Sequence, residues 1–414
     1  MAYLLNEKNR DWLSTHLADI VEIIGGGTPK TSIPEYWDGG IPWLCVNDFA
    51  GDSRYVDSAA KSISDEGLQN SSTKLLQKDD IIISARGTVG ELAQLVRPMA
   101  FNQSCFGVRA IPGYLDQHFL FYLLRFCVDD MRRRGHGSVF LSITRDTFKA
   151  IDVLIPTIAE QRDIASVLGA FDDKIAANQK VIKKTLELTF CLSSRRDGVE
   201  AKLEDIAEFI SRGVVPKYTE GPGKLIINQR CIRGGLVDRS QARWTSILPK
   251  DPVRLVHQYD VLINSTGQGT LGRMAPWIRK TESDNEVVTD THITTVRFNP
   301  EKVSPAFAAV VLASRESAMA NLAEGSTGQT ELKRELVRNF RMNLPPLEVQ
   351  NEISLAFHSL FAIVVAMEDE NEALIRTRDE LLPLLMSGKI SVRDAEEAVA
   401  EVGVEEREDD DNVQ

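Results

Sequence analysis

The chain has 414 residues, of which 43% are apolar and 26% charged, a composition typical of a globular protein of two or three domains. The net charge of −12 is concentrated in residues 394–414, where ten acidic residues stand against Arg407, so the rest of the chain carries only −3. DNA binding by one face is therefore compatible with the composition. No run approaches 18 consecutive apolar residues and no signal peptide is evident, which predicts a soluble cytoplasmic protein with five reduced cysteines.

In chain order, the first strong pattern is the apolar run 81–83, which predicts a buried strand ended by a turn. Residues 115–131 predict a buried helix, and a long helical pattern follows Pro156. The same succession returns in a strand at 261–263, a helix at 305–322 and a second long helix after the paired prolines Pro345 and Pro346. The predicted fold class is α+β, with two tandem domains that are each followed by a long helix.

The recurrence is visible residue by residue. The first block pairs Leu17, Asp19, Ile20, Glu22, Ile24, Gly27, Pro29 and Lys30 with Leu203, Asp205, Ile206, Glu208, Ile210, Gly213, Pro216 and Lys217. The second pairs Asp80–Ser84 and Gly90 with Asp260–Asn264 and Gly272, and the third pairs Ile155, Pro156, Gln161 and Ile164 with Leu344, Pro345, Gln350 and Ile353. Three blocks in one order at offsets of 180 to 189 indicate an internal duplication.

Both long helices show apolar residues at alternating steps of three and four, which is typical of a coiled-coil seam. The second seam is Ile353, Phe357, Leu360, Val364, Met367, Asn371, Leu374, Arg378, Leu381 and Leu385. The first is Ile164, Leu168, Phe171, Ile175, Asn178 and Ile182, after which Val181 and Leu188 suggest a drift in register. We expect the helices to pack on each other antiparallel; the alternative is that each docks on its own domain. Asn178 and Asn371 either fix the register as buried polar residues or are exposed.

Familiar catalytic motifs are missing. Gly25–Thr31 resembles a phosphate loop only superficially, because Pro29 replaces the glycine before the lysine and removes a backbone N–H. Asn343–Leu347 departs from the Asn-Pro-Pro-aromatic tetrapeptide of amino-methyltransferases at two positions. The six histidines lack metal-ligand spacing. These observations favour a recognition protein over an enzyme.

With the duplication in view, the chain resembles the specificity subunit of type I restriction–modification enzymes from about residue 12 to residue 392. The residues that carry this resemblance are Gly26–Thr31, Tyr36, Trp37, Ile41–Trp43, Asp48, Ser84–Gly90, Ile155, Pro156, Glu160, Gln161, Leu344–Leu347 and Gln350. The second copy departs from the pattern, since it reads Ser211-Arg212-Gly213 where the first has consecutive glycines. Two domains that read different sequences would differ in this way.

The resemblance implies target-recognition domains at 1–154 and 198–343, a central conserved helical region at 155–197 and a distal one at 344–392. The acidic composition of residues 393–414 predicts a disordered tail. The resemblance implies that each domain reads half of a bipartite asymmetric DNA site while the helices set the spacing. It also implies two modification subunits that methylate adenine N6, and restriction subunits that translocate and cleave DNA. S-adenosylmethionine, ATP and Mg would be bound by those partners, with no cofactor, metal or catalytic residue in this chain.

DNA contacts require Lys and Arg for phosphates, and Arg, Gln, Asn, Ser or Thr for base edges, on loops that fit a groove. The candidates in the first domain are Lys30, Thr31, Arg86, Thr88, Arg133, Arg134 and Ser138. Those in the second are Arg212, Lys217, Gln268, Thr270, Ser326, Thr327, Gln329 and Thr330. Any one of them could instead be a solvated loop residue. Two other functions stay open: a protein-binding scaffold that no longer reads DNA, and a methyltransferase that acts alone.

Overall fold

A computed structural model describes residues 11–51, 53–134, 142–193, 198–220, 223–246, 251–267, 269–281, 284, 286–322 and 331–397. The chain forms two compact units: unit 1 is Met1–Asn178 with Glu370–Gln414, and unit 2 is Gln179–Asp369. Each unit contains one mixed domain and part of both long helices. The predicted α+β class with two tandem domains is confirmed.

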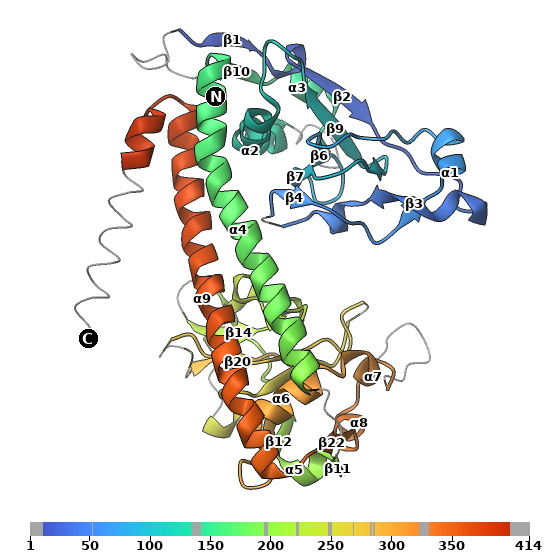
Figure 1. Ribbon diagram of the computed structural model, residues 1–414, viewed down its shortest axis with the longest axis vertical. Coiled ribbons are helices and arrows are strands. Elements are labelled where there is room, and N and C mark those ends of the chain that lie inside the picture. The colour runs from blue at the N-terminus through green and yellow to red at the C-terminus, as the bar shows by residue number, and fades with distance from the viewer. Residues whose placement is uncertain are drawn as a thin grey trace. The chain divides into compact units, whose positions relative to one another are not determined.

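In unit 1, a five-stranded sheet has the order β2-β9-β6-β7-β4, and a three-stranded sheet has the order β5-β3-β8 (Figure 1). Their bounds are β2 Val21–Gly25, β3 Trp37–Leu44, β4 Tyr55–Val56, β5 Ser62–Ile63, β6 Ile81–Ser84, β7 Leu92–Leu95, β8 Ala100–Phe101 and β9 Cys105–Ala110, while β1 Leu13–His16 pairs with β10 Asp152–Ile155. The helices are α1 Asp65–Gln69, α2 Gln117–Arg134 and α3 Arg145–Lys149, with 3-10 turns η1 Leu17–Asp19, η2 Pro34–Tyr36 and η3 Val46–Asp48. Ile81 and Ile83 join the core with α2 whereas Ile82 enters a second core, which is why β6 is continuously apolar.

Unit 2 repeats this plan with a sheet of order β12-β21-β18-β19 and another of order β13-β17-β14-β20. The strands are β11 Val199–Lys202, β12 Ala207–Arg212, β13 Tyr218–Thr219, β14 Lys224–Ile227, β15 Ile232–Arg233, β16 Leu236–Val237, β17 Arg243–Thr245, β18 Val261–Asn264, β19 Met274–Pro276, β20 Val288–Thr289, β21 Ile293–Phe298 and β22 Arg341–Leu344. The helices are α5 Leu203–Ile206, α6 Pro305–Ala313, α7 Glu316–Ala320 and α8 Arg334–Arg338, with 3-10 turns η5 Gln229–Cys231, η6 Arg239–Gln241 and η7 Pro252–Arg254. The single helix predicted at 305–322 is wrong: a break at Ser314 and Arg315 lets the Glu316 carboxylate accept a hydrogen bond from Met274 N at 3.1 Å.

The two long helices, α4 Ile158–Ser193 and α9 Leu347–Met386, run antiparallel, as predicted (Figure 1). In unit 1, Arg378 contacts Asp172 and Asn371 contacts Asn178, so residue numbers rise along one helix as they fall along the other. In unit 2, Ile182 and the rest of α4 share a core with the first half of α9. Each unit is therefore completed by segments of both helices.

The seam of α4 does not drift in register, which corrects that expectation. Val181 and Leu188 are 43% and 48% exposed, and the seam continues at its regular steps through the buried Thr185 and Thr189; Ser193, four residues further on, is also buried. The hydroxyls of Thr189 and Ser193 each donate to a carbonyl oxygen of the same helix, at 2.7 Å in both cases. Because those polar groups are satisfied internally, they can occupy a buried seam that an apolar pattern fails to reveal.

The α9 helix is long and apolar enough to cross a membrane by length and composition, since its most apolar window has a mean hydropathy of 1.4. Its apolar residues have partners within the protein, however. Phe357, Phe361 and Val364 are at most 2% exposed in the core of unit 2, and Phe357 stacks on Phe307 with ring centroids 6.0 Å apart. Leu355 and Ile363 are exposed on the same helix.

The structure also corrects the residue pairing in the first repeated block. Strand β12 has a bulge at Glu208 where it pairs with β21, so the extra residue of the second copy lies there and not after the glycine. The counterpart of Gly26 is therefore Gly213, and that of Glu22 is Phe209. In unit 1 Glu22 forms an ion pair with Arg109, whereas in unit 2 the guanidinium of Arg297 lies 5.4 Å from the centre of the Phe209 ring.

The third repeated block ties each long helix to its domain. Gln161 Oε1 accepts a hydrogen bond from Asp116 N at 2.8 Å, and its amide group donates to Pro156 O at 2.9 Å. Gln350 does the same with Ser304 N at 3.0 Å and Pro345 O at 2.8 Å. Both glutamines are buried, so the repeated motif has a structural role.

The cysteines do not all follow the expectation of reduced core thiols, although none of the five forms a disulfide. Cys105, Cys127 and Cys231 are buried, and burial raises the pKa of Cys105 to about 12 and that of Cys231 to about 11. Cys191, in contrast, is exposed on α4. The acidic tail predicted at 393–414 lies outside the described residues from residue 398 onward, and residues 392–397 are helical.

Candidate nucleic-acid interface

Three segments of unit 1 meet at the ends of its sheets: 26–31 after β2, 85–90 between β6 and β7, and 102–104 between β8 and β9. We call them the first loop cluster. The Thr28 hydroxyl donates to Gln103 Oε1, and Ala85 N donates to Ser104 O at 2.8 Å. The segment 102–104 therefore touches both of the others and holds them together.

Two tryptophans hold the segment 26–31 through hydrogen bonds to its backbone. Trp43 Nε1 donates to Gly27 O at 3.0 Å, and Trp37 Nε1 donates to Lys30 O at 3.3 Å. The two rings pack edge to face with centroids 5.1 Å apart. A Cβ at Gly26 would overlap the carbonyl oxygen of Asn102, so glycine is required there for the close approach of two backbone segments.

Unit 2 builds a second loop cluster in the same way from the segments 213–217, 265–267 with 269–270, and 290–292. Val214 N donates to Thr289 O and Ser265 N donates to His292 O, both at 2.8 Å. A Cβ at Gly213 would overlap the carbonyl oxygens of Thr289 and Asp290. The duplication thus preserves the backbone scaffold, while the exposed side chains on it differ.

Four of the predicted DNA contacts lie in the first loop cluster, where Lys30, Thr31, Arg86 and Thr88 are all exposed. Within the described part of the chain, neither Lys30 nor Arg86 has an ion-pair partner, so both cations are available to an anionic ligand. The last turn of α2 reaches this cluster, since Arg132 Nε donates to Val89 O at 2.8 Å.

The remaining candidates of unit 1 are placed differently. Arg133 and Arg134 are exposed at the end of α2, and each forms an ion pair with Asp130, at 3.4 and 3.2 Å. Ser138 lies outside the described residues. The chain returns to the cluster at Ile143, whose N–H donates to Ala85 O at 3.0 Å.

In unit 2, Lys217 is exposed in the second loop cluster, and Thr270 Oγ1 donates to Gly267 O at 3.4 Å. Arg212 is held by Glu331 at 2.7 Å and by the carbonyl oxygen of Leu332 at 3.2 Å, so its guanidinium joins the cluster to the chain before α8. The predicted contacts outside the described residues are Gln268, Ser326, Thr327, Gln329 and Thr330.

The sequence prediction missed the third segment of each cluster. Asn102-Gln103-Ser104 and Asp290-Thr291-His292 are short and contain no motif. An available signal was the recurrence of Asn or Asp at an offset of 188, directly before a strand, because such residues cap tight turns. Gln103 and His292 are exposed on these turns.

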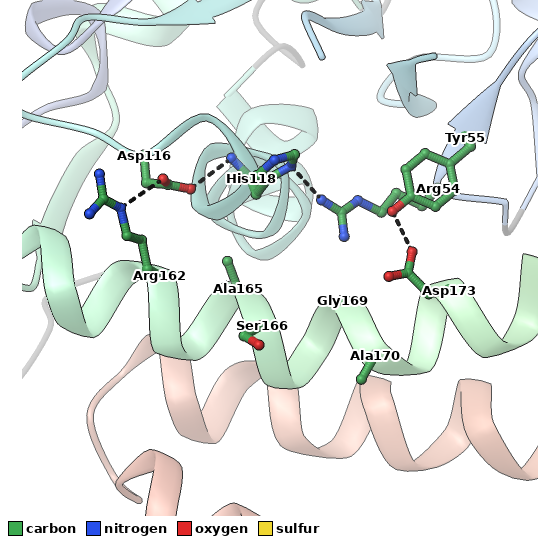
Figure 2. A pocket seen from close by; sticks show the side chains of 10 residues that line it. All are labelled: Arg54, Tyr55, Asp116, His118, Arg162, Ala165, Ser166, Gly169, Ala170 and Asp173. Carbon is green, nitrogen blue, oxygen red and sulfur yellow. Dashed lines mark hydrogen bonds and ion pairs between the residues drawn. The ribbon is translucent and has the colours of Figure 1, made fainter. Parts of the chain in front are cut away.

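A pocket of about 550 Å³ lies in unit 1 beside α2 and α4 (Figure 2). It is lined by Arg54, Tyr55, Asp116, His118, Arg162, Ala165, Ser166, Gly169, Ala170 and Asp173. Its ionic side chains have partners within the pocket lining, as in the Asp116–Arg162 pair at 3.5 Å, the contact of Arg54 with His118 at 3.1 Å and the hydrogen bond from the Tyr55 hydroxyl to Asp173 at 2.6 Å. Burial and the hydrogen bond to Asp173 raise the pKa of Tyr55 to about 12. Such mutual pairing favours a structural role for these groups.

The described ranges of the chain also lack a cluster of metal-ligating side chains. There, no three His, Cys, Asp or Glu residues come close enough together to hold a metal ion. The two loop clusters, with their exposed cations and hydrogen-bonding side chains, are therefore the better candidates for the functional site.

The chain matches, at residues 9–188 and again at 197–376, the sequence profile of the type I restriction modification DNA specificity domain. It therefore belongs to this family and carries two copies of the domain. The MjaIX specificity subunit of Methanocaldococcus jannaschii is 30% identical over 174 residues, which are 41% of this chain and 40% of that protein. The MjaVIII specificity subunit of the same organism is 21% identical over 92% of this chain and 94% of its own length. The crystal structure of an S subunit from M. genitalium aligns with 92% of this chain and 98% of its own, at 15% identity and a TM-score of 0.49.

Proposed function

We propose that the chain is the DNA-specificity subunit of a type I restriction–modification complex and works in the cytoplasm on double-stranded DNA. Each loop cluster reads one half of a bipartite asymmetric site, and the paired helices set the separation of the halves. The observation that carries this proposal is the repetition of one loop scaffold with different exposed side chains. A scaffold that reads two unrelated half-sites needs a constant backbone and variable contacts.

The chemistry belongs, in this proposal, to partner subunits, and the chain itself is not an enzyme. Two modification subunits bind S-adenosylmethionine and methylate adenine N6, and restriction subunits use ATP and Mg to translocate and cleave DNA. The exposed apolar side chains of Leu355 and Ile363 on α9 offer a surface to such a partner. The relatives' description as specificity subunits supports this division of labour.

The experiment that tests the proposal is methylation mapping of genomic DNA with and without the gene. We expect loss of one bipartite N6-methyladenine motif on deletion and its return when the gene is restored. Unchanged methylation in a strain that contains the modification subunits would contradict DNA reading by this chain.

The contribution of the exposed cations of the first loop cluster to DNA binding can be measured in vitro. Lys30→Ala and Arg86→Ala should each weaken DNA binding of the assembled complex and lower the slope of log affinity against log salt by about 0.9 per lost phosphate contact. Lys78→Ala is the matched control, because Lys78 is exposed and precedes β6, at the end remote from the cluster. Slopes equal to that of the wild type for both variants would show that neither cation contacts phosphate.

A further inference from the structure

The turns 102–104 and 290–292 are held by hydrogen bonds of their own, and each carries one exposed side chain, Gln103 and His292. Ser104 N donates to Asn102 Oδ1 at 3.0 Å, and His292 N donates to Asp290 Oδ1 at 2.9 Å. Each turn is closed by a further backbone bond, from Cys105 N to Asn102 O at 3.3 Å and from Ile293 N to Asp290 O at 3.2 Å. The two copies therefore present the same turn in the same setting.

The side chains on these turns differ between the copies, and each is supported by a threonine. In unit 1, the Thr28 hydroxyl donates to the side-chain oxygen of Gln103, which leaves the amide N–H groups of Gln103 free to donate. In unit 2, Thr266 Oγ1 lies 2.7 Å from His292 Nδ1. This contact uses one ring nitrogen of the imidazole, so Nε2 is the nitrogen that can contact a ligand. The supporting threonines come from different loops, so the two side chains are aimed differently from one backbone plan.

We infer that Gln103 and His292 are specificity-determining residues, each contacting a base edge in the half-site of its own unit; this inference rests on the proposed function. A side chain reads a base reliably when its position is fixed before binding. Both residues meet that condition, because the turn fixes the backbone and the threonine fixes the side chain. Gln103 has amide donors for acceptors in the major groove, and His292 has one ring nitrogen for a donor or an acceptor.

Methylation mapping of cells that carry the cognate subunits tests this inference, with the wild-type motif as reference. Gln103→Ala should relax the preference at one position of one half-site by roughly ten-fold, and His292→Ala should relax one position of the other half-site. Gln69→Ala is the matched control, since Gln69 is an exposed glutamine on α1. Thr28→Val should weaken the same position as Gln103→Ala, while Thr28→Ser keeps the hydroxyl and should retain the wild-type motif.

The inference is overturned if a bipartite motif is present in the wild type and both alanine variants leave it unchanged. It is also overturned if either variant alters both halves, because the turn would then support the fold and not one half-site. If the wild-type chain directs no bipartite motif, the proposed function itself fails. The two failures are therefore distinguishable in one data set.

Discussion

Replacement of Arg378 by methionine is expected to lower the free energy of unfolding by about 3–5 kcal/mol, because it leaves a buried charge without its partner. The Arg378 side chain is 0% exposed, and its Nη1 lies 2.5 Å from Oδ1 of Asp172, whose side chain is 1% exposed. The other oxygen of Asp172 accepts the hydroxyl of Tyr122 at 2.5 Å. Burial raises the pKa of Tyr122 and Asp172 adds to the rise, so the phenol stays neutral and donates a hydrogen bond to the carboxylate without neutralising its charge.

Urea denaturation at neutral pH measures this loss. Arg376→Met is the matched control, because Arg376 is exposed on the same helix and should cost less than about 0.5 kcal/mol. The double variant Asp172→Leu with Arg378→Met should recover most of the stability, since removing both buried charges also removes their desolvation cost. A loss below about 1 kcal/mol for Arg378→Met alone would show that Asp172 is not buried as described.

The same contact distinguishes the two copies of the duplication. At the offset of 189, Asp172 corresponds to Phe361 and Arg378 to Thr189, while Asn178 corresponds to Met367 and Asn371 to Ile182. The residues that form these buried polar contacts therefore correspond, in the other copy, to apolar or hydroxyl residues. A pairing of α4 with a second α4 would leave Asp172 without its arginine, so these contacts favour the pairing of unlike helices.

Gly26→Ala is expected to disable one half of the recognition site. The new methyl group would overlap the Asn102 carbonyl oxygen, and relieving that overlap moves the segment 26–31 or the turn 102–104 at a cost of about 1–3 kcal/mol. Because both segments belong to the first loop cluster, we expect affinity for the cognate site to fall by far more than non-specific binding does. Binding of the assembled complex to duplexes that carry either half-site measures this.

Gly25 supplies the control for that variant. A Cβ at Gly25 would meet nothing within 4 Å, so Gly25→Ala should keep both stability and site preference close to those of the wild type. Gly213→Ala should produce the same defect as Gly26→Ala, but for the other half-site. Equal behaviour of the Gly25 and Gly26 variants would contradict the close approach of the two backbone segments.

The periodic features of the fold could be predicted from sequence because many residues report on each of them. The strands at 81–83 and 261–263 are buried on both faces, and the helix at 115–131 corresponds to α2. The seam of α9 contains the two residues that look like errors in an apolar pattern, Asn371 and Arg378, and both are buried there. The duplication could be recognised because three blocks recur in order.

Features that depend on single residues could not be predicted. The bulge at Glu208 inserts one residue without changing the pattern of β12, so the sequence alone places the insertion wrongly. The continuation of the α4 seam uses the buried Thr185 and Thr189, and the Thr189 hydroxyl is satisfied by a hydrogen bond within its own helix, which an apolar pattern does not reveal. The turns 102–104 and 290–292 belong to the candidate site only because tertiary hydrogen bonds bring them to loops that are distant in sequence.

In the proposed architecture, a helical spacer joins two independent reading units. Exchange of residues 198–343 for the matching domain of another family member, followed by methylation mapping, tests it most directly. We expect one half of the motif to change, while the other half and the number of unread bases between them stay as in the wild type. A change in both halves would contradict independent reading, and a change in the spacer would contradict a spacing set by the helices.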